Sequence, residues 1–374
     1  MKSNYVIVNK SEIDDTEWDN LVFSSTDGWL YQTNYWINLI DKCEIRSSSF
    51  GVRSSKGQLL AVFPLYRGDY KALKFMTIKR LYTGLSGPVI SNTINQKQRN
   101  KLLKYMFKYI DDIAEFEKID ILQVRLTMLA PTYFSSESPT INPLFYVGLV
   151  SPISSQIEKA VQPLTRMIFL DKPEDQLLME METDCRAAVR QAERSGLDFV
   201  EGNSDDALST YVHLHDDSWR RTGLAPHTMS YFENMWSSLS QINAIKIFFA
   251  KHEGRVVAAI MVHVFKEGVF YWGGCSEGDS LKLRPNNFLL WNTICWAKNN
   301  GFRSFEIGQF YPSPTDNQKE YNVGKYKVQF GRDELVPFEG QKVYRSRKII
   351  IVELLNELKI LLRRCLGKNK DSYL

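Results

Sequence analysis

The chain has 374 residues, 44% of them hydrophobic and 13% aromatic, which excludes a disordered chain and is enough for two globular domains. Its 47 Lys and Arg residues against 43 Asp and Glu residues give a net charge of +4. This charge is too small for a protein that coats nucleic acid, but it is compatible with a local basic groove.

The first half of the chain contains four predicted elements in a fixed order. Residues 51–65, GVRSSKGQLLAVFPL, read as two strands joined by a tight turn at Lys56-Gly57. The stretch LYTGLSGPVIS follows at 81–91. A helix is then expected over 95–117 and a short strand over 119–124.

The second half repeats this order. The recurring elements are a hairpin at 249–265 that turns at Glu253-Gly254, a stretch at 270–280, a helix at 285–300 and a strand at 304–309. Four elements in the same order at a near-constant offset indicate a duplicated α/β unit. The connection between the copies is expected near 151–164, SPISSQIEKAVQPL, which is polar and contains prolines.

Two helices are predicted between the connection and the second hairpin. In DCRAAVRQAERSG (184–196), Arg186, Arg190 and Arg194 recur at a spacing of four and form a basic stripe on one helical face. Such guanidinium groups can clamp phosphate or carboxylate groups, although a solvated helix face explains the stripe equally simply. The second helix is expected within 211–226 and should end near Gly223.

Further candidate site residues follow the second hairpin. Glycines after Tyr271 and Trp272 are compatible with a β-bulge, whose free N–H groups could stabilise an oxyanion, or with a simple turn. Glu306 and Gln309 are placed at the end of a central strand, where α/β sheets usually meet ligands. Glu306 could act as a base if burial raises its pKa, or it could equally be a surface carboxylate or a structural partner of Lys327.

Residues 321–331, YNVGKYKVQFG, alternate lysines with aromatic residues, which predicts a strand. In that interpretation Lys325, Lys327 and Gln329 share one face, and Tyr326 and Phe330 lie on the core face. The lysine face would then meet solvent or a negatively charged ligand.

The sequence lacks the motifs of several common enzyme classes. The histidines show no metal-ligand spacing such as HExxH, and neither a GxSxG elbow nor a P-loop is present. We therefore expect no metal site and no serine hydrolase. The five cysteines lack a CxxC pair and are typical of reduced thiols: Cys43, Cys185, Cys275, Cys295 and Cys365.

The two ends of the chain bear on localisation. The N-terminal MKSNYVIVNKSE lacks the apolar centre of a signal peptide, and no apolar run is long enough to span a bilayer, so we expect a cytoplasmic protein. Residues 344–370 form a basic amphipathic helix candidate. It could pack against the body of the protein or make a peripheral contact with an anionic membrane at its inner face.

Taken together, these stretches resemble the FemAB family of acyl- and aminoacyltransferases within the GNAT-like acyltransferases. The similar segments span most of the chain and are WLYQTNYW (29–36), GLSGPVIS (84–91), 165–196, WRRTGL (219–224), 283–310 and YKVQFG (326–331). Two features depart from the family: the strand that commonly ends Asp-Phe-Gly-Gly ends here in Glu306-Ile307-Gly308-Gln309, and no coiled-coil arm is evident. The CoA-phosphate signature of ordinary GNAT enzymes, Gln/Arg-x-x-Gly-x-Gly/Ala, is not evident either, which leaves the donor open.

The resemblance implies a mixed α/β (α+β) fold with two tandem GNAT-like domains. The first domain would comprise 1–160, joined by the returning C-terminal segment 335–374, and the second, 161–334, would carry the donor channel. By the same resemblance, Lys327 with Tyr326 would line that channel, with Lys325 nearby. Arg186 and Arg190 would contact acceptor phosphates or carboxylates, and Tyr271 would lie near the same groove.

The resemblance also implies the chemistry. An activated acyl donor, either an aminoacyl-tRNA or an acyl-CoA, would be attacked by an amine of a nucleotide-linked or lipid-linked sugar or peptide precursor of the cell envelope. Three hypotheses stay open: N-acyl or aminoacyl transfer to such a precursor, acetyl-CoA-dependent N-acetylation of an amino sugar, and a non-catalytic protein that binds envelope precursors. Glu306 and Lys327 are the candidate catalytic residues.

Overall fold

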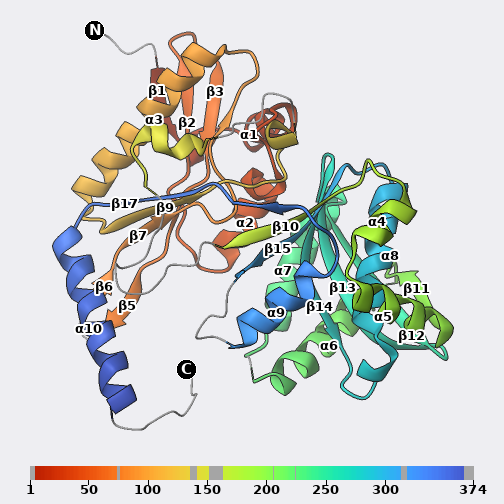
Figure 1. Cartoon of the computed structure of the whole chain (residues 1–374). Helices are drawn as coiled ribbons and strands as arrows, with labels where there is room; N and C mark the ends of the chain where they lie inside the picture. Colours follow the sequence, from red (N-terminus) through yellow and green to blue (C-terminus); the bar gives the residue numbers. More distant parts are fainter. Residues whose placement is uncertain are drawn as a thin grey trace.

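A computed structural model describes residues 5–73, 76–134, 141–150, 163–204, 206–223, 225–312 and 318–365. Two α/β halves lie side by side, with the N-terminal half on the left of Figure 1 and the second half on the right. Most of the connection predicted at 151–164 lies outside the described residues, as does the end of the basic segment beyond residue 365.

The second half is built on a seven-stranded sheet in the order β11-β12-β13-β14-β15-β10-β16 among the described residues. Its strands are β10 (Leu164–Phe169), β11 (Leu197–Glu201), β12 (Ile245–His252), β13 (Arg255–Phe265), β14 (Gly268–Ser276), β15 (Ser304–Phe310) and β16 (Glu334–Leu335). The β14–β15 pair is parallel and the other pairs are antiparallel. The predicted hairpin is confirmed, because Glu253 and Gly254 both have positive φ at the β12–β13 turn.

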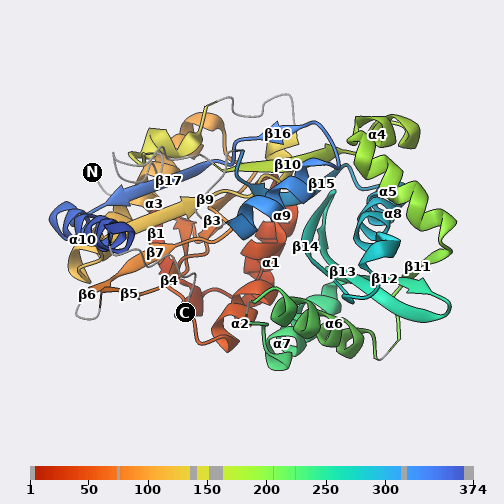
Figure 2. The same ribbon diagram turned by 60° about the horizontal axis from the view of Figure 1, so that its bottom comes forward.

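Helices cover both faces of this sheet (Figure 2). They are α4 (Glu174–Glu180), α5 (Thr183–Arg194), α6 (Ala207–Arg221), α7 (Met229–Leu239) and α8 (Pro285–Asn299). One buried cluster joins α5 and α8 to one face through Val189, Leu290 and Phe248. The predicted helices around 184–196, 211–226 and 285–300 are therefore confirmed, and Gly223 has the positive φ of a helix C-terminus.

The first half contains the matching elements, divided between two four-stranded sheets. One holds β1 (Tyr5–Asn9), β2 (Phe50–Ser54), β3 (Leu59–Phe63) and β8 (Val89–Ile90); the other holds β4 (Tyr66–Arg67), β7 (Arg80–Tyr82), β9 (Ile121–Arg125) and β17 (Glu339–Val343). A small hairpin of β5 (Tyr70–Leu73) and β6 (Met76–Ile78) lies beside them, with helices α1 (Asp15–Ser24), α2 (Asn34–Lys42) and α3 (Gln96–Phe116). The predicted first hairpin, helix and strand are thus confirmed as β2–β3, α3 and β9.

Helix α3 begins where the sequence expects it. Asn95 accepts a hydrogen bond from the Gln98 backbone, and the Gln98 side chain accepts one from the Asn95 backbone, which forms a capping box. Leu102, Met106 and Ile110 then recur at a spacing of four and bury one face of the helix against the first-half core.

The prediction of a strand at 321–331 is wrong, because residues Gln318–Val328 form a helix, α9. A helix turns by about 100° per residue, so Lys325 and Lys327 point to different sides instead of sharing a face. Lys325 is exposed over the Tyr321 ring, while Lys327 is partly buried against β15. The short alternation of lysines and aromatic residues did not distinguish a strand from a helix. In the folded chain this helix packs closely against β15.

After α9 the chain returns to the first half, as predicted. Strand β16 still pairs with β10, but β17 pairs with β9 along Glu339–Val343. Helix α10 (Ser346–Cys365) then runs along the outer side of the first half, near β5 and β6 (Figure 1). No helix among the described residues is long and apolar enough to cross a membrane.

Candidate active site

The candidate site lies where two parallel strands of the second half separate. Strands β14 and β15 pair only from Gly268 to Phe270 against Ser304 to Glu306, and the later residues of each strand diverge. Gly308 has a φ of 87° in the diverging part of β15, a conformation that favours glycine. Helix α9 packs against β15 beside this opening.

Lys327 is the cation at the opening. Its Nζ donates a hydrogen bond of 2.9 Å to the Gln309 carbonyl oxygen, and burial lowers its pKa to about 8. A Cβ at position 308 would lie 3.3 Å from this Nζ, so the glycine also makes room for the lysine. A pKa near 8 leaves the ammonium charged at neutral pH and holds that charge in a poorly solvated place.

Glu306 lies on β15, the strand that also contains Gly308 and Gln309, and is only 4% exposed. Its Oε1 accepts a hydrogen bond of 2.7 Å from the Thr165 hydroxyl on β10. Burial raises the pKa of Glu306, while Thr165, Arg125 and Lys327 act in the opposite direction. Burial therefore disfavours the charged form of both groups, and their opposite charges partly offset this effect.

A polar network continues from this pair into the first half. Gln309 Nε2 donates to Glu339 Oε1 at 2.8 Å, and Arg125 Nε lies 3.0 Å from the same oxygen. Arg125 ends β9, the first-half counterpart of β15. These residues border a groove of about 600 Å³ between the halves, which is lined in part by Arg80, Tyr82, Gln123, Arg125, Gln309 and Glu339.

Comparison with known proteins identifies the domain. Residues 180–321 match the family model described as an acetyltransferase (GNAT) domain. The lipid II:glycine glycyltransferase of Staphylococcus epidermidis is 31% identical over 98 residues, and that of Staphylococcus aureus is 33% identical over 92 residues. These matches span 26% and 24% of this chain and only 23% and 22% of the relatives.

Solved structures agree on the fold over nearly the whole chain. The crystal structure of FemX superposes with a TM-score of 0.69 at 16% identity, covering 91% of this chain and 98% of that one. The L-PGS structure from Bacillus licheniformis gives 0.52 at 14% identity, covering 91% and 96%. Residues 180–321 thus belong to the GNAT family, and the similarities to the glycyltransferases and to the fold of FemX support a FemAB-like relationship. The fold prediction of a mixed α/β chain with GNAT-like architecture is confirmed, whereas the division at residues 160 and 334 stays a prediction.

Tyr271 and Tyr326 pack in the hydrophobic cluster on one face of the second-half sheet, and Trp272 packs in the cluster on the other face. The β13–β14 register shifts between Met261 and Val262, so Trp272 occupies a β-bulge in a continuous strand and not a turn. Tyr271 packs with the α5–α8 cluster, close to Tyr326, whose hydroxyl donates to the Asn286 carbonyl oxygen at 2.9 Å. Trp272 packs into the other cluster, which α6 and α7 cover.

The basic stripe divides into different environments. Arg186 Nη1 donates to the backbone carbonyl oxygens of Met179 and Met181, so this guanidinium satisfies the end of α4. Arg190 and Arg194 are exposed on α5. The first turn of α5 adjoins the end of α9, because Glu182 N donates to the Gln329 carbonyl oxygen at 2.9 Å.

Sequence reasoning missed Arg125 and Glu339. The internal duplication contained a signal for Arg125, because the strand at 119–124 corresponds to the strand that carries Glu306 and Gln309. Glu339 had no such signal, since its place depends on the return of the chain to pair β17 with β9.

Proposed function

We propose that this chain transfers an acyl or aminoacyl group from an activated donor to an amine of a cell-envelope or surface-polysaccharide precursor. The observation that carries the proposal is the Lys327 ammonium, which is partly buried beside Glu306 where β14 and β15 separate. The FemAB-like relationship supports the reaction class, and relatives named for glycyl transfer to lipid II support the acceptor class.

The reaction forms one C–N bond and breaks one C–O or C–S bond. The amine nitrogen attacks the donor carbonyl carbon, and the carbonyl electrons move onto oxygen. The Lys327 ammonium and N–H groups at the Trp272 bulge would stabilise this oxyanion. Glu306 in its ionised form would take the proton from the attacking nitrogen. Collapse of the intermediate releases the ribose oxygen or the thiolate of the donor, which then takes up a proton.

The donor is either an aminoacyl-tRNA or an acyl-CoA, and no metal is required. The family description as an acetyltransferase favours a second candidate, an acetyl-CoA-dependent N-acetyltransferase that acts on an amino sugar. Release of free thiol during turnover would identify the CoA-dependent reaction. Loss of activity after ribonuclease treatment would identify the tRNA-dependent one.

The acceptor proposal assigns roles to the basic residues. A nucleotide-linked or lipid-linked sugar or peptide precursor carries a pyrophosphate, which Arg190 on the exposed face of α5 and Arg186 at its first turn would contact. Gln309, Lys325, Tyr271 and Tyr326 are proposed to line the route of the substrates. We also propose a cytoplasmic protein that touches the inner membrane surface through 344–370, where a lipid-linked acceptor would be presented.

Replacing Lys327 tests the proposal. In a strain that lacks the protein, mass spectrometry of peptidoglycan and surface glycans should show the loss of one defined acyl mass. Wild-type protein should restore that mass, whereas Lys327→Ala should reduce product formation at least ~100-fold, the typical effect of removing an oxyanion donor.

Lys282→Ala is the control, because it removes an exposed lysine of the second half that has no proposed role in binding or catalysis. It should restore product to within a few-fold of wild type. Full restoration by a folded Lys327→Ala protein would remove Lys327 from the mechanism. Precursor binding without any product from wild-type protein would favour the non-catalytic alternative.

A further inference from the structure

The first half contains its own opening between strands, at the position that corresponds to the candidate active site. Strand β7 pairs in parallel with β9 from Arg80–Tyr82 against Ile121–Gln123, as β14 begins by pairing with β15. After β7 the chain no longer pairs with β9 as a strand, and the next strand, β8, pairs with β3 in the other sheet. An isolated bridge pairs Ser86, in the stretch between β7 and β8, with Arg125 at the end of β9. The first-half sheet therefore opens where the second-half sheet opens.

In the second half, α9 with Tyr326 and Lys327 packs at the opening. In the first half, the opening is a cavity of about 880 Å³, within the size range of small-molecule sites. The residues on either side of β8, helix α3 and the turns after β9 surround it. Its apolar wall includes Ile94, Leu103, Phe107, Leu126, Leu144 and Val147.

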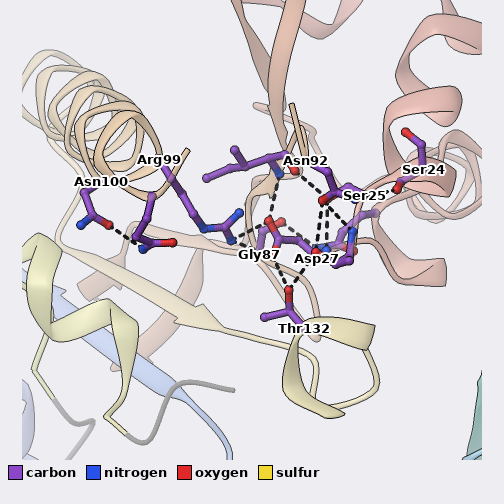
Figure 3. A network of polar contacts seen from close by, with 12 residues as sticks. Ser24, Ser25, Asp27, Gly87, Asn92, Arg99, Asn100 and Thr132 are labelled. Carbon is purple, nitrogen blue, oxygen red and sulfur yellow. Dashed lines mark hydrogen bonds and ion pairs between the residues drawn. The ribbon is translucent and has the colours of Figure 1, made fainter. Parts of the chain in front are cut away.

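An ion pair forms the polar end of this cavity (Figure 3). Arg99 Nη2 lies 2.7 Å and 2.6 Å from the two carboxylate oxygens of Asp27. Asp27 is only 7% exposed and also accepts from Thr132 Oγ1 and from the Ile90 backbone, both at 3.1 Å. The carboxylate is thus fully used inside the protein.

Arg99 keeps donors that the ion pair does not use. Its hydrogen bonds to described residues all use Nη2, so Nη1 and Nε keep their donors. The Arg99 side chain is 26% exposed and lines the cavity. Among the described residues that line the cavity, Asp27 is the one acidic side chain, and its carboxylate is already used by Arg99, Thr132 and the Ile90 backbone. The polar end therefore favours an anion over a cation.

The mouth of the cavity is apolar. Ile141 and Tyr146 border it and are 56% and 68% exposed, although both are side chains that usually avoid water. A ligand that pairs an anionic group with an apolar chain would satisfy Arg99 and cover the apolar wall and the mouth together.

We propose that this first-half cavity, built around Asp27 and Arg99, is a second binding site for an amphiphile with an anionic head group and a hydrocarbon chain. The site is separate from Lys327 and does not depend on the proposed transfer reaction. Its apolar wall would hold the chain, and Arg99, oriented by Asp27, would hold the head group.

Calorimetric titration with dodecyl phosphate tests this site. Wild-type protein should bind it, and dodecyltrimethylammonium, which has the same chain with a cationic head, should bind at least ten times more weakly. Asp27→Asn/Arg99→Gln, which removes both charges together, should weaken dodecyl phosphate binding at least tenfold. Leu103→Trp, which fills the cavity without changing its charge, should do the same.

Two control variants distinguish binding in this cavity from binding elsewhere on the protein. Lys101→Gln removes a positive charge from the exposed side of α3 and should bind as wild type does. Lys327→Ala should also bind as wild type does, so failure of the transfer proposal leaves this test intact. Equal binding of both amphiphiles, no binding to wild type, or unchanged binding in folded Leu103→Trp would overturn the proposal.

Discussion

At the scale of single residues, His263 shows how strongly the contact between the halves depends on neutral side chains. It is fully buried on β13, and its Nδ1 lies 2.9 Å from the Tyr31 hydroxyl of the first half. The Trp272 ring stacks on it with centroids 5.2 Å apart. Burial lowers the pKa of His263 to about 3, because there is no water to solvate an imidazolium ion.

This lowered pKa predicts acid sensitivity. Unfolded chains bind the histidine proton below about pH 6.5, but the folded chain does not bind it until about pH 3, so stability falls as the pH drops through this window. One such group contributes a slope of up to about 1.4 kcal/mol per pH unit. Urea unfolding between pH 7 and pH 4 should give a shallower slope for His263→Gln than for wild type.

The exposed His213 provides the control for this measurement. His213→Gln should not make the slope shallower as His263→Gln does, because it leaves the buried His263 in place. Burial lowers the pKa of His215 to about 4, so His215 still contributes to the pH dependence of stability in the His263→Gln protein. An identical slope for wild type and His263→Gln would contradict the prediction.

At the scale of elements, α10 has two different apolar surfaces. Val352 and Ile349 pack against the β5–β6 region, whereas Ile350, Ile351, Leu354 and Leu358 are each 46–56% exposed. Residues 351, 354 and 358 share one helical face, and the exposed Arg345 and Arg347 lie at the start of the helix. An apolar face with cations beside it is typical of helices that bind anionic membrane surfaces.

The membrane proposal can be tested with vesicles. Co-sedimentation with vesicles that contain phosphatidylglycerol should recover wild-type protein, and Leu354→Glu/Leu358→Glu should reduce recovery at least fivefold by placing charge on the apolar face. Neutral phosphatidylcholine vesicles should recover little of either protein. Equal recovery of wild type and the double variant would exclude α10 as the membrane contact.

At the scale of the whole molecule, the two halves share a hydrophobic cluster. Trp29 and Tyr31 of the first half belong to the same cluster as Phe232 and Phe265 of the second. Lys266 crosses the contact as well, since its Nζ donates to the carbonyl oxygens of Val22 at 2.9 Å and Ser25 at 2.5 Å. Burial lowers the pKa of Lys266 to about 8.

This shared cluster predicts that the halves unfold together. Tryptophan fluorescence and far-ultraviolet circular dichroism should report one urea transition. Lys266→Met should lower the free energy of unfolding by ~1–3 kcal/mol, because the Val22 carbonyl oxygen loses this donor and the Ser25 carbonyl oxygen keeps only the Gly28 N–H. Lys282→Met, at an exposed lysine, should change it little. Two separate transitions in the wild-type protein would contradict this prediction.

The sequence predicted elements well where one local rule decided them. The hairpin turns at Lys56-Gly57 and Glu253-Gly254, the capped helix α3 and the arginine-bearing helix α5 all follow from turn chemistry or from apolar spacing. The alternation in 321–331 gave a wrong prediction, because eleven residues are too few to distinguish a strand from a helix. Tyr326 and Phe330 are four residues apart and their rings are in contact, as expected for neighbouring turns of a helix.

By itself, the sequence determined the duplicated order of elements, the FemAB-like resemblance and the choice of Glu306, Gln309 and Lys327 as candidate polar residues near one strand. Only the tertiary structure decided which groups surround them. Arg125 and Glu339 are distant in sequence and meet because β17 pairs with β9. The Asp27–Arg99 pair likewise joins two residues that are distant in sequence. Local spacing specifies turns and helix faces, whereas burial and the meeting of distant charges depend on how the whole chain packs.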